Sequence, residues 1–123
     1  LSRPGADAAE ALTPLVSRLA GHPRLARIVA GFVRELGPRL DRMQAALAVA
    51  DMHELAAQAH WLKGSGGSMG FDDFFEPSKA LEDAAKLADL AALTAQVDIL
   101  QTLARRVRLG APVAAAEQEV ATV

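Results

Sequence analysis

The sequence has no cysteine and no tyrosine, and its aromatic residues are one tryptophan and four phenylalanines. Without cysteine, the chain can form no disulfide bond and offers no thiolate to a metal ion. β-branched residues are sparse, and no segment alternates polar and apolar residues in the manner of a half-buried strand. These absences favour a helical domain that folds in a reducing compartment.

An excess of one charge and long apolar runs are also lacking. Thirteen lysines and arginines stand against fifteen aspartates and glutamates, which gives a formal net charge of −2. The sequence therefore shows no basic footprint for nucleic acid or for an anionic membrane. No apolar run approaches the roughly 20 residues of a membrane span, and no signal-peptide pattern opens the chain. We expect a cytoplasmic protein that contacts neither nucleic acid nor membrane.

The length of 123 residues suits one domain with a real core. Residues 1–12 read as an N-terminal linker. The proline and glycine after the last periodic segment leave residues 110–123 as an alanine-rich tail. The domain itself is expected over residues 13–109.

Apolar residues recur every three or four positions along most of the chain, which is typical of amphipathic helices. Thr13 and Pro14 resemble an N-cap followed by a first-turn proline, and they predict a short helix over residues 13–20. Four longer helices are expected over residues 24–50, 51–69, 72–88 and 89–108. Short connections between long helices predict an all-α fold, an antiparallel up-and-down four-helix bundle with an additional short N-terminal helix.

The stretch "AHWLKGSGGSMG", residues 59–70, contains four glycines. A phosphate-binding loop would place a lysine after the glycines and a strand before them, whereas Lys63 precedes the glycines here. The apolar stripe of the preceding helix instead continues through them at spacings of three and four, in Met52, Leu55, Ala59, Leu62, Gly66 and Met69. We therefore expect a helix to about Met69, with Gly70 ending it, despite a propensity cost of about 2–3 kcal/mol for three glycines.

On this helix His60 lies roughly 140° from the core direction that Leu55 defines, so its ring is expected to face solvent. Gly64, four residues later, has no side chain, and Ala57, three residues earlier, has only a methyl group. Packing explains Gly66, which lies on the core side. Close approach by a second protein explains Gly64 better.

Lys63 lies about 60° around the helix from His60, and its flexible stem can bring an ammonium to a group attached to the ring. His53, Ala57 and Gly67 share the side of His60 and are predicted to be the partner-docking surface. A pair of histidines seven residues apart is not a usual zinc spacing, so we predict no metal site.

The residues of this stretch resemble the H-x-L-K-G-[SA]-x(4)-G signature of histidine-containing phosphotransfer (HPt) domains. The matching positions are His60, Leu62, Lys63, Gly64, Ser65 and Gly70. Further agreement comes from Phe32, Asp51, Phe74 and the "ALE" segment at residues 80–82. The resemblance covers about residues 13–108.

The resemblance implies a phosphoryl carrier and not an enzyme. His60 would accept a phosphoryl group from the phospho-aspartate of a response-regulator receiver domain and pass it to another receiver. Lys63 would sit beside the added charge, and Gly64 would let the receiver's loops reach the ring. The receiver would supply Mg²⁺, so the chain itself needs no cofactor. A monomer is expected, either free-standing or as part of a sensor histidine kinase.

Two other interpretations remain open. The segment "SMGFDDF" also resembles the phosphoacceptor domain of chemotaxis kinases. A helical docking or dimerisation module without phosphotransfer would have the same fold. The combination of His60, Lys63 and Gly64 favours phosphoryl transfer, because pure docking needs no nucleophile.

Overall fold

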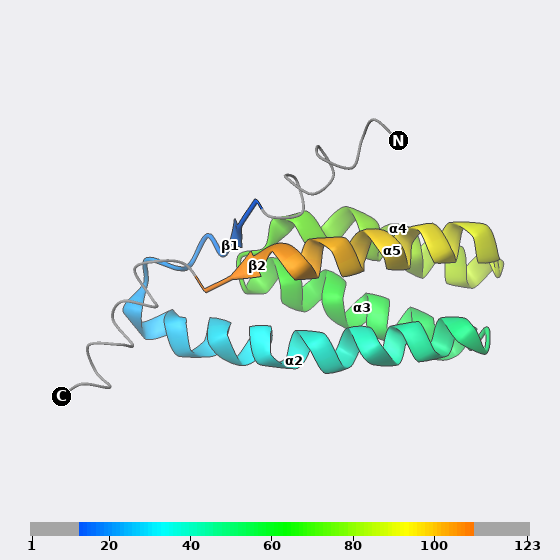
Figure 1. The fold of residues 1–123 in the computed structure, drawn as a ribbon, viewed down its shortest axis with the longest axis horizontal. Coiled ribbons are helices and arrows are strands. Elements are labelled where there is room, and N and C mark those ends of the chain that lie inside the picture. Colours follow the sequence, from blue (N-terminus) through cyan, green and yellow to red (C-terminus); the bar gives the residue numbers. More distant parts are fainter. Residues whose placement is uncertain (1–12, 110–123) are drawn as a thin grey trace.

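The computed structural model describes residues 13–109 and consists mainly of helices. Its elements are β1 (Leu15–Val16), α2 (Pro23–Ala48), α3 (Met52–Ser68), the 3₁₀ turn η1 (Asp72–Phe74), α4 (Phe75–Leu87), α5 (Leu90–Arg106) and β2 (Val107–Arg108). The four helices lie side by side, and successive helices run in opposite directions (Figure 1). The predicted all-α class is confirmed, and the predicted linker and tail fall outside the described residues. Within the described part of the chain, no helix is long and apolar enough to span a bilayer.

The predicted helix over residues 13–20 is wrong. Leu15–Val16 instead forms β1, which pairs in parallel with Val107–Arg108, a short strand pair that nothing in the apolar periodicity anticipates. Isolated helices of this length are unstable in water, so tertiary hydrogen bonds decide the conformation. The backbone N–H of Arg18 donates to the Gly70 carbonyl at 2.9 Å, and residues 18–21 form a turn ahead of α2.

Helix α3 follows the limits that its sequence predicts. The Asp51 side chain accepts a hydrogen bond from the Glu54 N–H at 3.1 Å and caps the first turn. At the other end, Gly70 adopts a φ of +85°, and the Phe71 N–H reaches the Gly66 carbonyl at 2.8 Å. This pattern is a glycine-terminated Schellman cap. The glycine-rich stretch is therefore helical, and Gly70 ends the helix as predicted.

Helices α3 and α4 pack closely because small residues line their contact. A Cβ atom at Gly66 would lie 3.1 Å from the Cβ of Phe74, so a larger residue does not fit there without a shift. Ala59 on α3 and Ser78 on α4 are both buried. Glycine at position 66 thus serves packing, as the sequence predicts. The close approach brings the outer face of α4 beside the exposed face of α3.

The core lies between the four helices. Its largest fully buried side chains come from every helix and from the turn after α3, namely Met43, Leu55, Leu62, Phe71, Phe74, Leu81, Leu93, Val97 and Leu100. None of the three histidines belongs to this core. The helices thus form a stable frame on which α3 displays one face to solvent.

Candidate functional site

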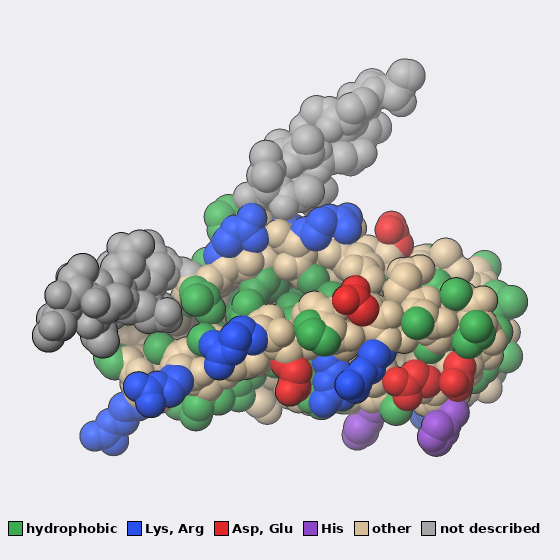
Figure 2. Space-filling view, turned by 60° about the horizontal axis from the view of Figure 1, so that its bottom comes forward, with side chains coloured by type: hydrophobic (Ala, Val, Ile, Leu, Met, Phe, Trp, Pro, Cys, Tyr) green, Lys and Arg blue, Asp and Glu red, His purple; other side chains and the backbone are tan. Residues whose placement is uncertain are grey.

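His60 projects from the middle of α3, and 73% of its side chain is exposed. Leu55, Ala59 and Leu62 of the same helix are fully buried, so the imidazole stands on the opposite side from the core. Histidine side chains project from one edge of the surface shown in Figure 2. The exposure of His60 agrees with its helical placement and leaves the ring accessible to another protein.

Glu82 of α4 connects His60 to Lys63. One carboxylate oxygen lies 3.0 Å from Nδ1 of His60, and the other accepts a hydrogen bond from Nζ of Lys63 at 2.7 Å. The hydrogen bond from Lys63 is the main reason why the pKa of Glu82 lies below its usual value, with a smaller contribution from His60 and partial burial acting in the opposite direction. Glu82 is therefore ionised at neutral pH.

This contact determines which nitrogen of the ring is available for reaction. An ionised carboxylate can only accept hydrogen bonds, so Nδ1 of His60 carries the hydrogen in this pair. In the neutral ring the lone pair then resides on Nε2. The arrangement orients the ring from one side and leaves Nε2 as the nucleophilic atom.

Lys63 lies one turn along α3 from His60, as predicted, but its ammonium contacts the Glu82 carboxylate and not the His60 ring. Only 27% of its side chain is exposed, compared with 73% for His60. The lysine therefore orients the carboxylate that orients the histidine. It is also close enough along α3, one turn away, for its flexible side chain to turn toward a charge on the ring.

The glycines around His60 differ in what surrounds them. A Cβ atom added at Gly64 or Gly67 would meet no heavy atom within 4 Å, in contrast to the tight contact at Gly66. Helix propensity alone would favour alanine at both open positions by about 1 kcal/mol. The surface beside His60 is thus bare, and no packing contact accounts for it.

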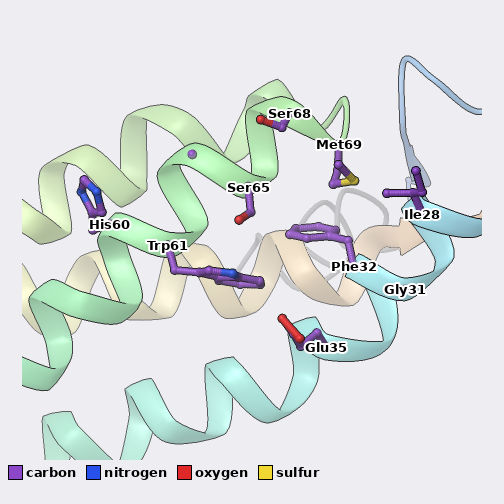
Figure 3. Close-up of a pocket in the computed structure, with 10 residues that line it drawn as sticks. Ile28, Gly31, Phe32, Glu35, His60, Trp61, Ser65, Ser68 and Met69 are labelled. Atoms are coloured by element: carbon purple, nitrogen blue, oxygen red, sulfur yellow. The ribbon is translucent and has the colours of Figure 1, made fainter. Parts of the chain in front are cut away.

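An open groove of about 540 Å³ runs from His60 along the interface of α2 and α3. It is lined by Ile28, Gly31, Phe32, Glu35, His60, Trp61, Gly64, Ser65, Ser68 and Met69 (Figure 3). The rings of Phe32 and Trp61 stack with centroids 5.5 Å apart, and the guanidinium of Arg39 lies 4.3 Å from the Trp61 ring centre. The groove is lined largely by apolar side chains, and the imidazole of His60 lies at one end of it.

The residues predicted as the docking surface do not line this groove. His53 and Ala57 are exposed and Gly67 is half-buried. By helical geometry all three lie on the same side of α3 as His60. They lie in one row with His60 along the exposed side of α3, a row that we call the ridge.

Sequence reasoning missed the role of Glu82, and it named no docking residue on α2, although the resemblance implies a docking surface drawn from the phosphoacceptor helix and the helix before it. The "ALE" segment at residues 80–82 carries part of the family resemblance and was the available signal for Glu82. Spacing within one helix cannot reveal a contact with a residue on another helix. The aromatic side chain of Phe32 gave a similar signal for α2.

No group of three or more histidine, aspartate or glutamate side chains within residues 13–109 is arranged to hold a metal ion. The ion pairs at the site join His60 to Glu82 and, through Glu82, to Lys63. This set provides one nucleophile, one acceptor for its proton and one cation.

Comparison with protein families gives one match. Residues 27–111 match the family model described as the Hpt domain. No curated protein and no solved structure shows a significant match to the sequence. The matched segment begins four residues into α2 and includes the rest of α2, the three later helices and all three residues of the cluster.

Proposed function

The chain belongs to the Hpt domain family, whose members are phosphocarriers in two-component phosphorelays and interact with receiver domains, and from this premise we propose that His60 carries a phosphoryl group from one receiver domain to another. The observation that supports the proposal is the exposed His60 ring, whose Nδ1 is held by Glu82 at 3.0 Å. An unreactive surface histidine would not need such an oriented partner.

In the proposed transfer, Nε2 of His60 attacks the phosphorus of the receiver's aspartyl phosphate. The new N–P bond forms as the bond from phosphorus to the carboxyl oxygen breaks, and the aspartate carboxylate leaves with the electron pair. Nδ1 keeps its hydrogen, so the phosphorylated ring carries a positive charge. The Glu82 carboxylate stabilises this charge through the hydrogen bond at Nδ1.

The same atoms serve the second transfer in reverse. The carboxylate of the next receiver attacks the phosphorus, the N–P bond breaks, and the electron pair returns to Nε2 of His60. Because a positively charged ring is the better leaving group, Glu82 assists this step as well. Lys63 is placed one turn away to interact with the phosphoryl oxygens, which add a charge of roughly −2.

The receiver is expected to bring what the chain does not provide. Its acidic pocket would hold Mg²⁺, which neutralises charge on the transferring phosphoryl group. Gly64, at which a Cβ would meet open space, would admit the receiver's loops to the ring. The ridge of His53, Ala57 and Gly67 and the α2–α3 groove are the surfaces on which the receiver would dock.

The wider context is also proposed from this role. Receiver domains would meet the carrier in the cytoplasm, which is the location we propose. A monomer suits the role because the face around His60 must stay free for successive partners. The carrier would act either alone or within a sensor histidine kinase.

Transfer in both directions tests this function. A panel of receivers labelled with ³²P on aspartate should pass the label to the native chain, and the purified phospho-chain should label a second, unphosphorylated receiver. The His60→Gln variant is the control, and it should accept no label. Label taken from a kinase with ATP but from no receiver would contradict the receiver-to-receiver role and favour a chemotaxis-type phosphoacceptor domain.

A further inference from the structure

Residues 13–22, which we call the strap, precede the segment that matches the family model. The strap nevertheless contacts the end of the phosphoacceptor helix. It passes over the last turn of α3, and its strand β1 pairs with β2 after α5. In Figure 3 the chain ahead of α2 passes beside Ile28 and Met69 at one end of the groove.

Arg18 provides the most extensive contact of the strap. Its guanidinium binds Asp72 at both carboxylate oxygens, at 2.6 and 3.2 Å, and donates to the carbonyl of Gly67 at 3.2 Å. The side chains of Arg18 and Asp72 are 57% and 61% exposed. An ion pair this exposed contributes little to the free energy of unfolding. These contacts join the strap to both sides of the turn that connects α3 to η1.

Ser17 fixes the same turn from within. It is buried, its hydroxyl donates to the Met69 carbonyl at 2.5 Å, and the same oxygen accepts the N–H of Leu19 at 2.9 Å. A Cβ atom at Gly70 would collide with the Ser17 hydroxyl and lie 2.9 Å from the Arg18 nitrogen. The strap and the turn thus fit against each other without space between them.

The turn that the strap holds forms one end of the groove. Ser68 and Met69 line the groove there, opposite Ile28 of α2, while His60 and Gly64 line it farther along α3. Displacement of this turn would change the shape of the groove without reaching the His60–Glu82 pair. We propose that Arg18 and Ser17 are positioning residues that hold the groove in the shape that a receiver binds. This inference rests on the proposed function.

Arg18→Ala in the full chain tests the inference through two phosphoryl donors. A phosphorylated receiver must dock, whereas phosphoramidate is small and needs no docking surface; in that reaction Nε2 bonds to phosphorus and ammonia leaves. The receiver concentration that gives the half-maximal transfer rate should be roughly two- to fivefold higher for the variant than for the native chain. This fold-change corresponds to the free energy that an exposed ion pair typically contributes. The maximal rate and the rate with phosphoramidate should not change.

Two matched variants sharpen the result. Arg42→Ala removes the same charge from an exposed position of α2 and should leave both reactions unchanged. Asp72→Asn removes the carboxylate partner of Arg18 but leaves its hydrogen bond to the Gly67 carbonyl, so its effect should have the same direction as that of Arg18→Ala and be no larger, and the double variant should equal Arg18→Ala. An unchanged receiver concentration in Arg18→Ala would overturn the inference, as would an equal slowing with both donors.

Amide hydrogen exchange supplies a test that needs no receiver. The N–H groups of Met69, Gly70 and Phe71 donate within the turn that the strap holds. They should exchange faster in Arg18→Ala than in the native chain, while amides in the middle of α5 should not change. Native exchange rates at the turn would refute the positioning role. Failure of the proposed function would show differently, as a native chain that accepts no phosphoryl group from receivers.

Discussion

The carboxylate of Glu82 lies 3.0 Å from Nδ1 of His60, although the two residues stand on different helices. The same carboxylate is bound by Lys63 at 2.7 Å. The contact converts an exposed histidine into an oriented one, because an ionised acceptor keeps the hydrogen on Nδ1 and the lone pair on Nε2.

Glu82→Gln should slow phosphorylation of His60. The amide has the size of the carboxylate but no charge, so it cannot stabilise the positive ring that forms during transfer. We expect a loss of roughly 10²-fold in transfer rate, within the range for removal of one electrostatic partner. Stopped-flow transfer from a phosphorylated receiver measures it. A rate equal to that of the native chain would show that the contact has no part in the chemistry.

Lys63→Ala should reduce the transfer rate and leave receiver affinity nearly unchanged, because it removes charge without changing the open surface at Gly64. Part of the loss should come through Glu82, whose carboxylate then has His60 as its remaining partner in this cluster. Rates and binding constants measured separately for the same receiver distinguish the two effects. A large loss of affinity with an unchanged maximal rate would contradict this assignment.

Gly64→Ala should stabilise the fold and slow transfer. The new methyl group meets open space, so helix propensity and a less disordered unfolded chain raise the free energy of unfolding by about 0.4–1 kcal/mol. The same methyl group narrows the approach to His60, and Gly64→Gln should slow transfer further. Thermal unfolding and transfer kinetics on the same samples measure both effects.

Two variants serve as controls for this comparison. Gly66→Ala should lower the melting temperature, because its Cβ would lie 3.1 Å from that of Phe74. Ala88→Gly should raise stability by about 1 kcal/mol, because Ala88 adopts a φ of +53°, which favours glycine. Ala88 lies at the C-terminal end of α4, so this gain should leave transfer unchanged. A destabilised Gly64→Ala chain with undiminished transfer would falsify the bare-surface explanation.

The Glu82 interactions should also appear in the pH dependence of stability. The folded-state pKa of Glu82 lies below its ordinary value, chiefly because of the hydrogen bond from Lys63. Its contribution is therefore fully present above the unfolded pKa of about 4.3. The contribution disappears as the pH falls through the lower folded-state value. The difference in melting temperature between the native chain and Glu82→Gln should shrink below about pH 4, where the carboxylate becomes protonated. A difference that stays the same as the pH falls through this range would contradict the ionised state of Glu82.

Much of the fold could be predicted because its signals are local. The helices predicted over residues 51–69 and 89–108 begin at Asp51 and Asp89, whose side chains cap them, and Gly70 ends α3 as predicted. The exposure of His60 follows from its angle to Leu55 on one helix. The contrast between Gly64 and Gly66 follows from the same angles.

The features that could not be predicted depend on contacts between elements distant in the sequence. The segment around Ser17 has a plausible helix start, yet its hydrogen bonds go to the end of α3. Glu82 is 22 positions from His60, and only the close packing of α3 and α4 brings them together. Local periodicity carries no information about either contact.

The most direct test of the central claim is to locate the phosphoryl group after transfer from a phosphorylated receiver. The chain labelled with ¹⁵N in histidine, observed by NMR with ³¹P detection, should show one phosphorus bonded to Nε2 of His60 and a hydrogen retained on Nδ1. The bond should be labile in acid and stable in alkali, as a phosphoramidate is, and the signal should be absent from His60→Gln. Phosphorus on His53, on a serine or on Nδ1 of His60 would contradict the account.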